Sequence, residues 1–169
     1  NGSGVLTYAW DLDNDGVYDD ASGMSPTVSW EALHMLGLYN SIHLQVTDAE
    51  NFTDSQTTTL AIHNVSPVAN AGGPYAINEG ESLILDASGS SDAGGDSLTY
   101  AWDLDNDGVY DDATGVSPTV TWSTLNALGI SGVGTAHTIG LQVKDTENAR
   151  SNRITSLTIS DVPPVADAG

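Results

Sequence analysis

Apolar and polar residues alternate along several short stretches of the chain, which is the pattern of a β-strand with one buried face. Residues 42–48 read Ile-His-Leu-Gln-Val-Thr-Asp, and residues 139–145 read Ile-Gly-Leu-Gln-Val-Lys-Asp. Residues 6–10 and 98–102 both read Leu-Thr-Tyr-Ala-Trp, so Tyr and Trp share one strand face. These tryptophans either pack in a core or stack on sugar rings, and their alternation along the strand favours the core.

The patterns recur at a nearly fixed spacing, which indicates an internal repeat. Residues 25–30, Ser-Pro-Thr-Val-Ser-Trp, return 92 positions later as Ser-Pro-Thr-Val-Thr-Trp at residues 117–122. After an insertion at 130–136 the spacing becomes 97, and residues 59–62 and 156–159 form the last expected strand of each copy. We expect Trp30 and Trp122 to be buried, because they share a strand face with a valine two residues earlier.

The repeat divides the chain into three parts. Residues 1–65 form a repeat that lacks its first two strands, and residues 66–163 form a complete repeat that opens with strands at 69–77 and 82–86. Residues 164–169 match residues 67–72 and begin a third repeat. The sequence opens with Asn-Gly-Ser-Gly, neither a signal peptide nor a natural start, so we expect a segment of a longer protein.

One short helical turn interrupts the strands of each copy. Leu33 and Leu36, and in the second copy Leu125 and Leu128, are spaced three residues apart and are followed by a glycine. This spacing predicts a single turn with a Gly stop. With about seven short strands per copy and turn residues between them, the sequence predicts an all-β chain of tandem immunoglobulin-like β-sandwiches.

Composition narrows the classes of partner. The formal net charge is −20, with 3 basic residues, all at or after Lys144, and no cysteine. Nucleic acid and anionic membrane surfaces both need cationic patches, so neither is an expected partner. Disulfides are excluded, and no apolar run approaches the roughly 20 residues that span a bilayer.

An acidic loop follows the Leu-Thr-Tyr-Ala-Trp strand in both copies. The ten residues Asp-Leu-Asp-Asn-Asp-Gly-Val-Tyr-Asp-Asp occupy positions 11–20 and 103–112. Carboxylates at alternate positions and a glycine at the sixth follow the start of an EF-hand calcium loop. The twelfth position is Ser22 or Thr114 rather than Glu, and the loop leaves a strand, so it is more similar to DxDxDGxxD loops between strands.

We therefore predict one calcium site in each loop, since five carboxylates in ten residues would repel one another without a cation. The alternative is an acidic, solvated loop that binds nothing. The predicted ligands include the carbonyl of the valine, with the final aspartate of each loop a spare or outer carboxylate. They are Asp11, Asp13, Asp15, Val17, Asp19 and Asp20 in the first copy, and Asp103, Asp105, Asp107, Val109, Asp111 and Asp112 in the second.

The sequence gives weaker signals for a further cation site, a zinc site or a catalytic site. Two further acidic groups, Asp48/Glu50 with its repeat Asp145/Glu147, and Asp86/Asp92/Asp96, either help a second cation or serve ordinary Asp-rich turns, and we favour turns. The four histidines do not recur between copies, as a zinc site would require. No Ser or Thr has a recurring His and acid, so no catalytic residue is predicted and the chain is not expected to be an enzyme.

At this point the sequence resembles a PKD domain, the polycystin-type repeat. The resemblance rests on residues 67–75, 85–92, 98–103 and 141–145, and it spans the second copy and what is present of the first. The family usually has a short Phe-Gly-Asp-Gly turn after the Trp-Asp pair. The longer acidic loop here resembles a subset of bacterial and archaeal surface proteins.

The resemblance implies an extracellular or cell-surface β-sandwich that serves as a spacer or contact surface, with no catalytic residue. We expect a calcium-stabilised structural module of a stalk, sheath or fibre. The alternative is an adhesion or carbohydrate-binding accessory module, which should show an exposed aromatic or apolar patch. The aromatic residues here fall on predicted core faces, and Phe52 is the one exception that we expect to be exposed. The expected partners are neighbouring repeats of the same protein, by strand addition to the incomplete first repeat.

Overall fold

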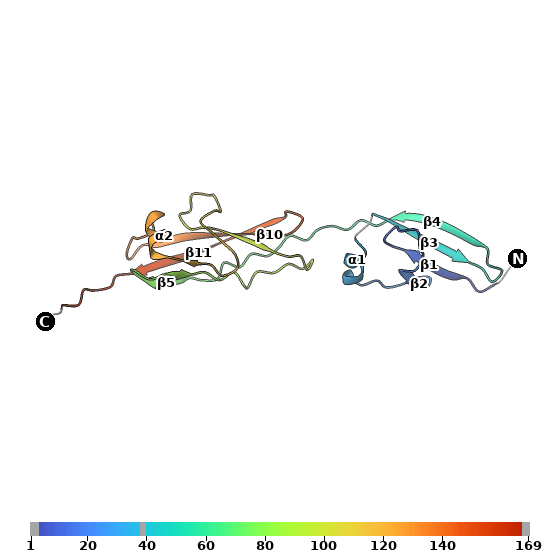
Figure 1. Cartoon of the computed structure of the whole chain (residues 1–169), viewed down its shortest axis with the longest axis horizontal. Helices are drawn as coiled ribbons and strands as arrows, with labels where there is room; N and C mark the ends of the chain where they lie inside the picture. The colour runs from blue at the N-terminus through green and yellow to red at the C-terminus, as the bar shows by residue number, and fades with distance from the viewer. Residues whose placement is uncertain (1–3, 38–39, 167–169) are drawn as a thin grey trace. The chain divides into compact units, whose positions relative to one another are not determined.

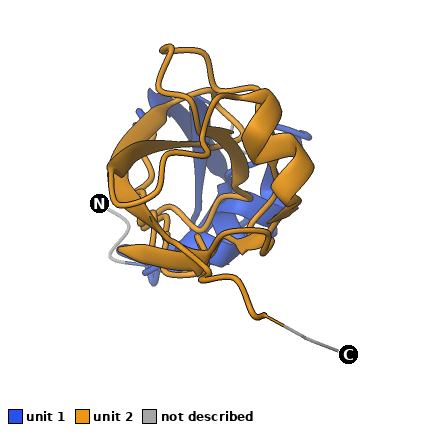
Figure 2. Ribbon diagram, turned by 90° about the vertical axis from the view of Figure 1, so that its left-hand side faces the viewer, with its two compact units in different colours: residues 1–63 blue, residues 64–169 orange. Residues whose placement is uncertain are grey.

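The computed structural model describes residues 4–37 and 40–166. It divides into two compact units, residues 1–63 and 64–169, which are coloured separately in Figure 2. Of the predicted third repeat, residues 164–166 carry no strand, and residues 167–169 lie outside the described part of the chain.

Unit 2, residues 64–169, is a two-layered β-sandwich (Figure 1). Its larger sheet has the order β5-β11-β10-β7-β8, and its smaller sheet pairs β6 with β9. The strands of the larger sheet are β5 (Tyr75–Asn78), β11 (Arg150–Ser160), β10 (Ala136–Lys144), β7 (Thr99–Asp103) and β8 (Ala113–Thr114). Those of the smaller sheet are β6 (Leu83–Ile84) and β9 (Thr119–Val120).

The core of unit 2 lies between these layers. Trp102 from β7, Leu141 from β10 and Leu157 from β11 are all 0% exposed. Leu83 at 1% and Val120 at 4% face them from the smaller sheet. The alternation read from the sequence therefore turns one face of each strand inward, and the prediction that Trp102 is a core residue is confirmed.

A short helix follows in each unit, as the leucine spacing predicted. In unit 2 it is α2 (Trp122–Ala127), where the Thr121 hydroxyl accepts a hydrogen bond from the Thr124 N–H and Leu125 is fully buried. In unit 1 it is α1 (Trp30–Leu36), which ends at Gly37 with a φ of 94°. A side chain with a Cβ resists that left-handed conformation, which explains the glycine stop.

Unit 1, residues 1–63, repeats only part of this arrangement. Its sheet has the order β2-β1-β3-β4, with β1 (Thr7–Asp11), β2 (Ala21–Ser22), β3 (Ser41–Thr47) and β4 (Thr53–Thr59). These strands correspond to β7, β8, β10 and the first part of β11. Among the described residues of unit 1, nothing corresponds to β5, β6 or β9.

The missing strands account for two differences in the strands that remain. In unit 2, β5 pairs with residues Leu157–Ser160 of β11, and without such a partner β4 already ends at Thr59. β6 pairs with β9 in unit 2, and without it the equivalent residues 27–28 are not a strand. Strands therefore persist in unit 1 only where a neighbour supplies the ladder.

Burial in unit 1 is correspondingly incomplete. Trp10 is only half-buried, whereas its repeat Trp102 is 0% exposed. The prediction that Trp30 is a core residue is wrong, because the helix begins at Trp30 and leaves this side chain 42% exposed. Its counterpart Trp122 packs partly buried against the core of unit 2.

The architecture confirms the predicted all-β sandwich fold with one short helix per repeat. No helix in the described part of the chain is long and apolar enough to cross a membrane.

Equivalent leucines in the two repeats allow the packing of the two cores to be compared by mutation. Leu125→Ala removes a side chain that is 0% exposed and should lower the free energy of unfolding of unit 2 by about 2–5 kcal/mol, the range for cavity-forming leucine truncations. Leu33→Ala, at the equivalent but partly exposed position, should cost unit 1 clearly less. Urea titration followed by the indole N–H signals of the four tryptophans, two in each unit, separates the two effects. Equal costs would contradict the difference in packing.

Candidate metal centres

Each acidic loop connects two paired strands, so its ends are fixed by the sheet. The first loop runs from the end of β1 to β2, and the second from the end of β7 to β8. The loops close through matching backbone hydrogen bonds, Asp20 N–H to Trp10 O and Asp112 N–H to Trp102 O, both 3.1 Å long. The two copies can therefore be compared atom by atom.

Two residues with positive φ in each loop produce the sharp turn. In the first loop these are Asn14 at 58° and Gly16 at 87°, and in the second they are Asn106 at 59° and Gly108 at 92°. Glycine and asparagine tolerate this left-handed region better than other residues. The sequence Asp-Asn-Asp-Gly thus folds the loop back over the carboxylates that precede it.

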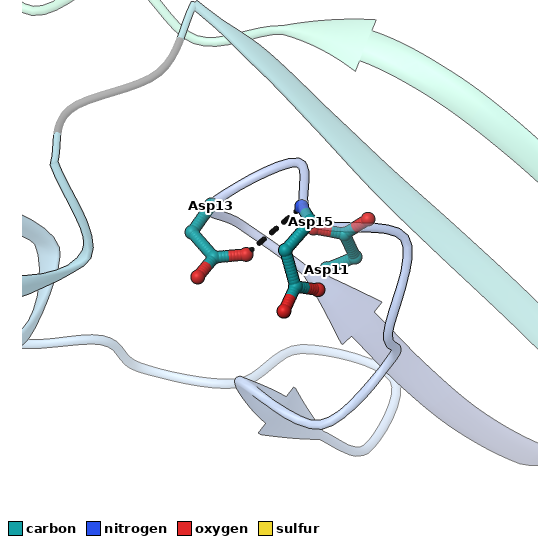
Figure 3. Close-up of side chains that lie close together, drawn as sticks. All are labelled: Asp11, Asp13 and Asp15. Carbon is teal, nitrogen blue, oxygen red and sulfur yellow. Dashed lines mark hydrogen bonds between the residues drawn. The ribbon is translucent and has the colours of Figure 1, made fainter.

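Three aspartates converge in the first loop. One carboxylate oxygen each from Asp11, Asp13 and Asp15 lies within 4.8 Å of the others. Figure 3 shows these side chains gathered beside the loop, with the dashed hydrogen bond from the Asp15 N–H to Asp13 Oδ1, 3.1 Å long. Asp103, Asp105 and Asp107 form the same group in the second loop.

Backbone amides orient these carboxylates and use only one oxygen of each. Asp11 Oδ2 accepts from the Gly16 N–H at 3.1 Å, and Asp15 Oδ1 accepts from the Val17 N–H at 2.7 Å. The second loop repeats both bonds, from the Gly108 N–H to Asp103 Oδ2 and from the Val109 N–H to Asp107 Oδ1. The remaining oxygens stay free to bind a ligand.

The strongest local feature is one buried oxygen in each loop. Asp11 is 2% exposed and Asp103 is 3% exposed, and the Oδ1 atom of each has no hydrogen-bond partner. A buried carboxylate oxygen without a donor is costly, because it has lost water and gained nothing in return. A cation in the loop would supply the missing interaction.

The electrostatics agree with this geometry. The pKa of Asp13 is raised above 3.8, first because the protein removes water from its carboxyl group, and further by the charges of Asp20, Asp15 and Asp11. A backbone hydrogen bond from Asp15 opposes this effect without cancelling it. The pKa of Asp105 is raised for the same reasons. No Lys or Arg precedes Lys144 in the sequence, so unit 1 has no side-chain cation of this kind to offset the charge.

The final aspartate of each loop has a different position from the three that converge. Asp20 Oδ2 accepts hydrogen bonds from the Leu12 and Asp13 N–H groups, at 2.6 and 3.1 Å. Asp112 Oδ2 accepts from the Leu104 and Asp105 N–H groups, at 2.6 and 3.3 Å. These two carboxylates brace the loop from outside the converging group. Val17, Asp19, Val109 and Asp111 are exposed in the same loops, and their ligand roles stay predictions.

The structure also shows contacts that sequence reasoning missed. His43 does not recur in the second copy, yet its Nε2 lies 2.6 Å from Asn14 Oδ1 in the first loop, and its Nδ1 lies 2.9 Å from Thr57 Oγ1. In unit 2 the equivalent residue is Gly140, which lies against Tyr110 of the second loop. The residue at this strand position therefore lies next to its loop in both units, but it differs in type, so the two sequences do not show the relation.

A third acidic group lies in unit 2. Asp92, Asp96 and Asp145 bring one oxygen each within 4.8 Å, joining residues that the sequence had placed in two separate groups. Asp145 is 2% exposed, and both of its oxygens accept hydrogen bonds, from the Ala149 N–H and from Asn64 Nδ2, each at 2.8 Å. These two bonds let Asp145 hold the turn without a metal, but Asp92 Oδ2 in the same group is buried with no hydrogen-bond partner, like Asp11 Oδ1 and Asp103 Oδ1.

The donor sets of the two loops fit calcium. Ca²⁺ takes six to eight oxygen ligands, including carboxylates and backbone carbonyls, in flexible geometry. Each loop offers three converging carboxylates, and the converging groups of the described residues contain no nitrogen or sulfur ligand. The valine carbonyl is a further, predicted ligand. These residues would hold a hard cation, and they show no nucleophile paired with a base.

Comparison with known protein families gives a match to the second repeat. A family model described as PKD domain matches residues 64–159, more than half of the chain. This domain is a non-catalytic module, and no catalytic domain was found. Comparison with curated proteins gave no match.

Several solved structures are similar in fold. One is a nucleoside hydrolase-related hypothetical protein from Saccharophagus degradans, with 24% identity and a TM-score of 0.43 over 57% of this chain and 26% of that one. This chain thus spans only about a quarter (26%) of the length of that protein. Another is the PKD1 domain of Vibrio anguillarum Epp, with 22% identity and a TM-score of 0.42 over 59% of this chain and all (100%) of that one.

Immunoglobulin domains are also similar. Sidekick-1 immunoglobulin domains 1–5 match with 14% identity and a TM-score of 0.44, over 94% of this chain and 33% of that one. These likenesses concern the fold alone, which is an immunoglobulin-like, PKD-type β-sandwich with two short helices. The first repeat shares the loop and strand sequences of the second, whose residues carry the family match. The chain belongs to the PKD domain family.

Proposed function

We propose that this chain is a calcium-stabilised structural module, a spacer within a repetitive extracellular or cell-surface protein. The observation that carries the proposal is the buried, unpartnered oxygen of Asp11 and of Asp103, each within a group of three converging carboxylates. The same arrangement occurs in both repeats, so each module would bind its own ion. Neighbouring repeats of the same protein are the proposed partners.

Calcium would act on stability rather than on chemistry. The unfolded loop cannot hold three carboxylates within 4.8 Å, so the ion binds the folded loop far more tightly. Because the loop begins at the end of a core strand, an ordered loop also fixes the end of the sheet. A chain of such modules would be stiffer in a calcium-rich medium than in a chelating one.

The alternative function, an adhesion or carbohydrate-binding module, is favoured by exposed aromatic side chains in unit 1. Phe52 is 76% exposed and Trp30 is 42% exposed. Trp30, however, lies in the unit that lacks a second layer, and its counterpart Trp122 packs against a core. The missing layer explains the exposure of Trp30 without a ligand, which leaves Phe52 as a single exposed aromatic among the described residues, so we retain the structural proposal.

Calcium should raise the unfolding temperature of both units. At a calcium concentration about a hundredfold above Kd the gain is about 2.7 kcal/mol per module, which corresponds to roughly 10–20 °C for a module of this size. Differential scanning calorimetry in millimolar calcium and after chelation measures it. Magnesium should act weakly, because it demands a near-octahedral site and gives up its water reluctantly.

Asp103→Asn is the matched variant for this experiment, because it keeps the side-chain shape and removes the charge. It should abolish the calcium-dependent gain in unit 2 and leave that of unit 1 intact, while Asp11→Asn should do the reverse. Asp161→Asn, at an exposed position outside the loops, should leave both gains unchanged. If calcium shifts neither unit of the unsubstituted protein, the loops are solvated turns and the proposal fails.

The calcium effect should also depend on pH. The raised pKa of Asp13 and Asp105 means that the metal-free folded loops bind more protons than the unfolded chain just above pH 3.8. The contribution of these groups to metal-free stability is therefore present at low pH and is lost as the pH rises through the raised folded pKa. At neutral pH, where these carboxylates are ionised, calcium would supply the positive charge that offsets their repulsion.

The calcium-dependent rise in unfolding temperature should accordingly shrink between neutral pH and about pH 4, where protons compete for the same oxygens. Scanning calorimetry of metal-free and calcium-loaded protein across this range measures the difference. A rise that stays constant down to about pH 4 would mean that these carboxylates do not bind the ion.

A further inference from the structure

One side chain outside the first acidic loop reaches the loop from a neighbouring strand. His43 lies on β3, on the opposite face from Ile42 and Leu44, because successive strand residues point to opposite faces. It stands directly across the ladder from Asp11, the last residue of β1 and the first of the three converging aspartates. The pairing of β1 with β3 therefore sets the imidazole beside the loop.

Both ring nitrogens of His43 have a partner. Nε2 lies 2.6 Å from Asn14 Oδ1, and Nδ1 lies 2.9 Å from Thr57 Oγ1 on β4. An amide oxygen only accepts, so in the neutral ring Nε2 donates to Asn14 and Nδ1 accepts from the Thr57 hydroxyl. Ser41 Oγ is a more distant neighbour of Nε2, at 3.3 Å. A chain of polar groups thus runs from β4 through β3 to the loop.

Asn14 is the residue at which the first loop turns. It has a φ of 58°, and Figure 3 shows Asp13 and Asp15, the residues on either side of it. A residue with a Cβ adopts this left-handed conformation less readily than glycine does, so a hydrogen bond to its side chain helps to hold it there. Because Asp13 and Asp15 are its chain neighbours, holding Asn14 also restricts where their carboxylates point.

The second loop lacks this contact, although its ten residues are identical. Gly140 replaces His43, pairs with Asp103 and has no side chain to reach Asn106. Tyr110 of the loop occupies the space instead, since a Cβ at Gly140 would lie 3.2 Å from Tyr110 Cε1 and 3.4 Å from Asp103 Cβ. The strand position next to the first aspartate is therefore filled by an imidazole in unit 1 and by a tyrosine ring in unit 2.

We propose that His43 is a positioning residue for the first calcium loop: by holding Asn14 in the turn, it raises the calcium affinity of this loop and not that of the second. This inference rests on the proposed calcium binding and deepens it, because it adds to one site a residue that is not a ligand. An ion that binds an already ordered loop loses less affinity to ordering. One hydrogen bond of ordinary net strength changes Kd about two- to tenfold.

Calcium titration of the whole chain, followed by NMR, tests the two loops separately. The amide signals of Gly16 and Gly108 report one loop each. His43→Asn should weaken calcium binding in the first loop about two- to tenfold and leave the second unchanged. His43→Gln should keep the original affinity, because the amide nitrogen of glutamine is as many bonds from Cα as Nε2, whereas that of asparagine matches Nδ1.

A double substitution identifies the partner. Asn14→Gly removes the side chain that the imidazole holds and keeps the left-handed backbone accessible. In this background His43→Asn should change the calcium affinity no further, because its partner atom is already gone. Asn106→Gly makes the same change in the second loop, and in that background His43→Asn should have its full effect on the first.

A measurement without metal separates positioning from ligation. The Asp15 N–H donates to Asp13 Oδ1 across the turn. In the metal-free chain its hydrogen should exchange faster in His43→Asn than in His43→Gln, because the turn is then held less firmly. The equivalent Asp107 N–H of the second loop, which donates to Asp105 Oδ1, should exchange at the same rate in both variants.

Each outcome decides the question. A difference between His43→Asn and His43→Gln that is confined to the first loop, and that disappears with Asn14→Gly, supports the proposal. Unchanged affinity in both variants overturns it, and so does an equal loss in both, which would mean that the imidazole only fills space. If the unsubstituted chain binds no calcium in either loop, the proposed function fails as well. Calcium binding that does not depend on residue 43 overturns this inference alone.

Discussion

Closure of the sandwich is the constraint on which the rest of the structure depends. A sheet with one apolar face must bury that face against another layer. In unit 2 residues 83–87 supply part of that layer, together with Ala69, Ala71 and Ile130, and Trp102, Leu141 and Leu157 of the larger sheet are 0% exposed. In unit 1 the same sheet residues stay partly exposed, although their sequence is nearly the same. The difference in burial between the two units therefore arises from the missing layer and not from the residues of the sheet.

The acidic loops impose a second constraint, which concerns negative charge rather than the burial of apolar side chains. They concentrate negative charge where the sheet ends, and each buries one carboxylate that has no donor for its second oxygen. A loop built only for solubility would leave its aspartates in water, as Asp54 or Asp161 are. The hydrogen bonds from Gly16, Asp15 and Val17 instead turn the carboxylates toward one point. Backbone hydrogen bonds hold the loop in this conformation. The repulsion between its carboxylates raises the free energy of that conformation.

Sequence reasoning reached most of the fold because repetition and alternation are local signals. Strands 42–48 and 139–145, the helix after residue 29 and the acidic loops were all visible in the order of residues. It failed where burial depends on a distant segment. Trp30 was expected in the core because a valine precedes it at strand spacing, yet the chain there is helical and its cover is absent. The contact of His43 with Asn14, and the meeting of Asp92 with Asp145, join residues far apart in sequence that no periodicity relates.

Core and loop are joined through a single residue in each unit. Leu104 lies between Asp103 and Asp105 of the loop, yet it is 1% exposed and belongs to the core cluster. Its counterpart Leu12 lies between Asp11 and Asp13 and lines an open cavity of unit 1. Packing of this leucine restricts the carboxylates on either side of it. An ion that orders those carboxylates would in turn hold the leucine in place. Because such coupling is reciprocal, metal binding in the loop and packing of the core would stabilise one another.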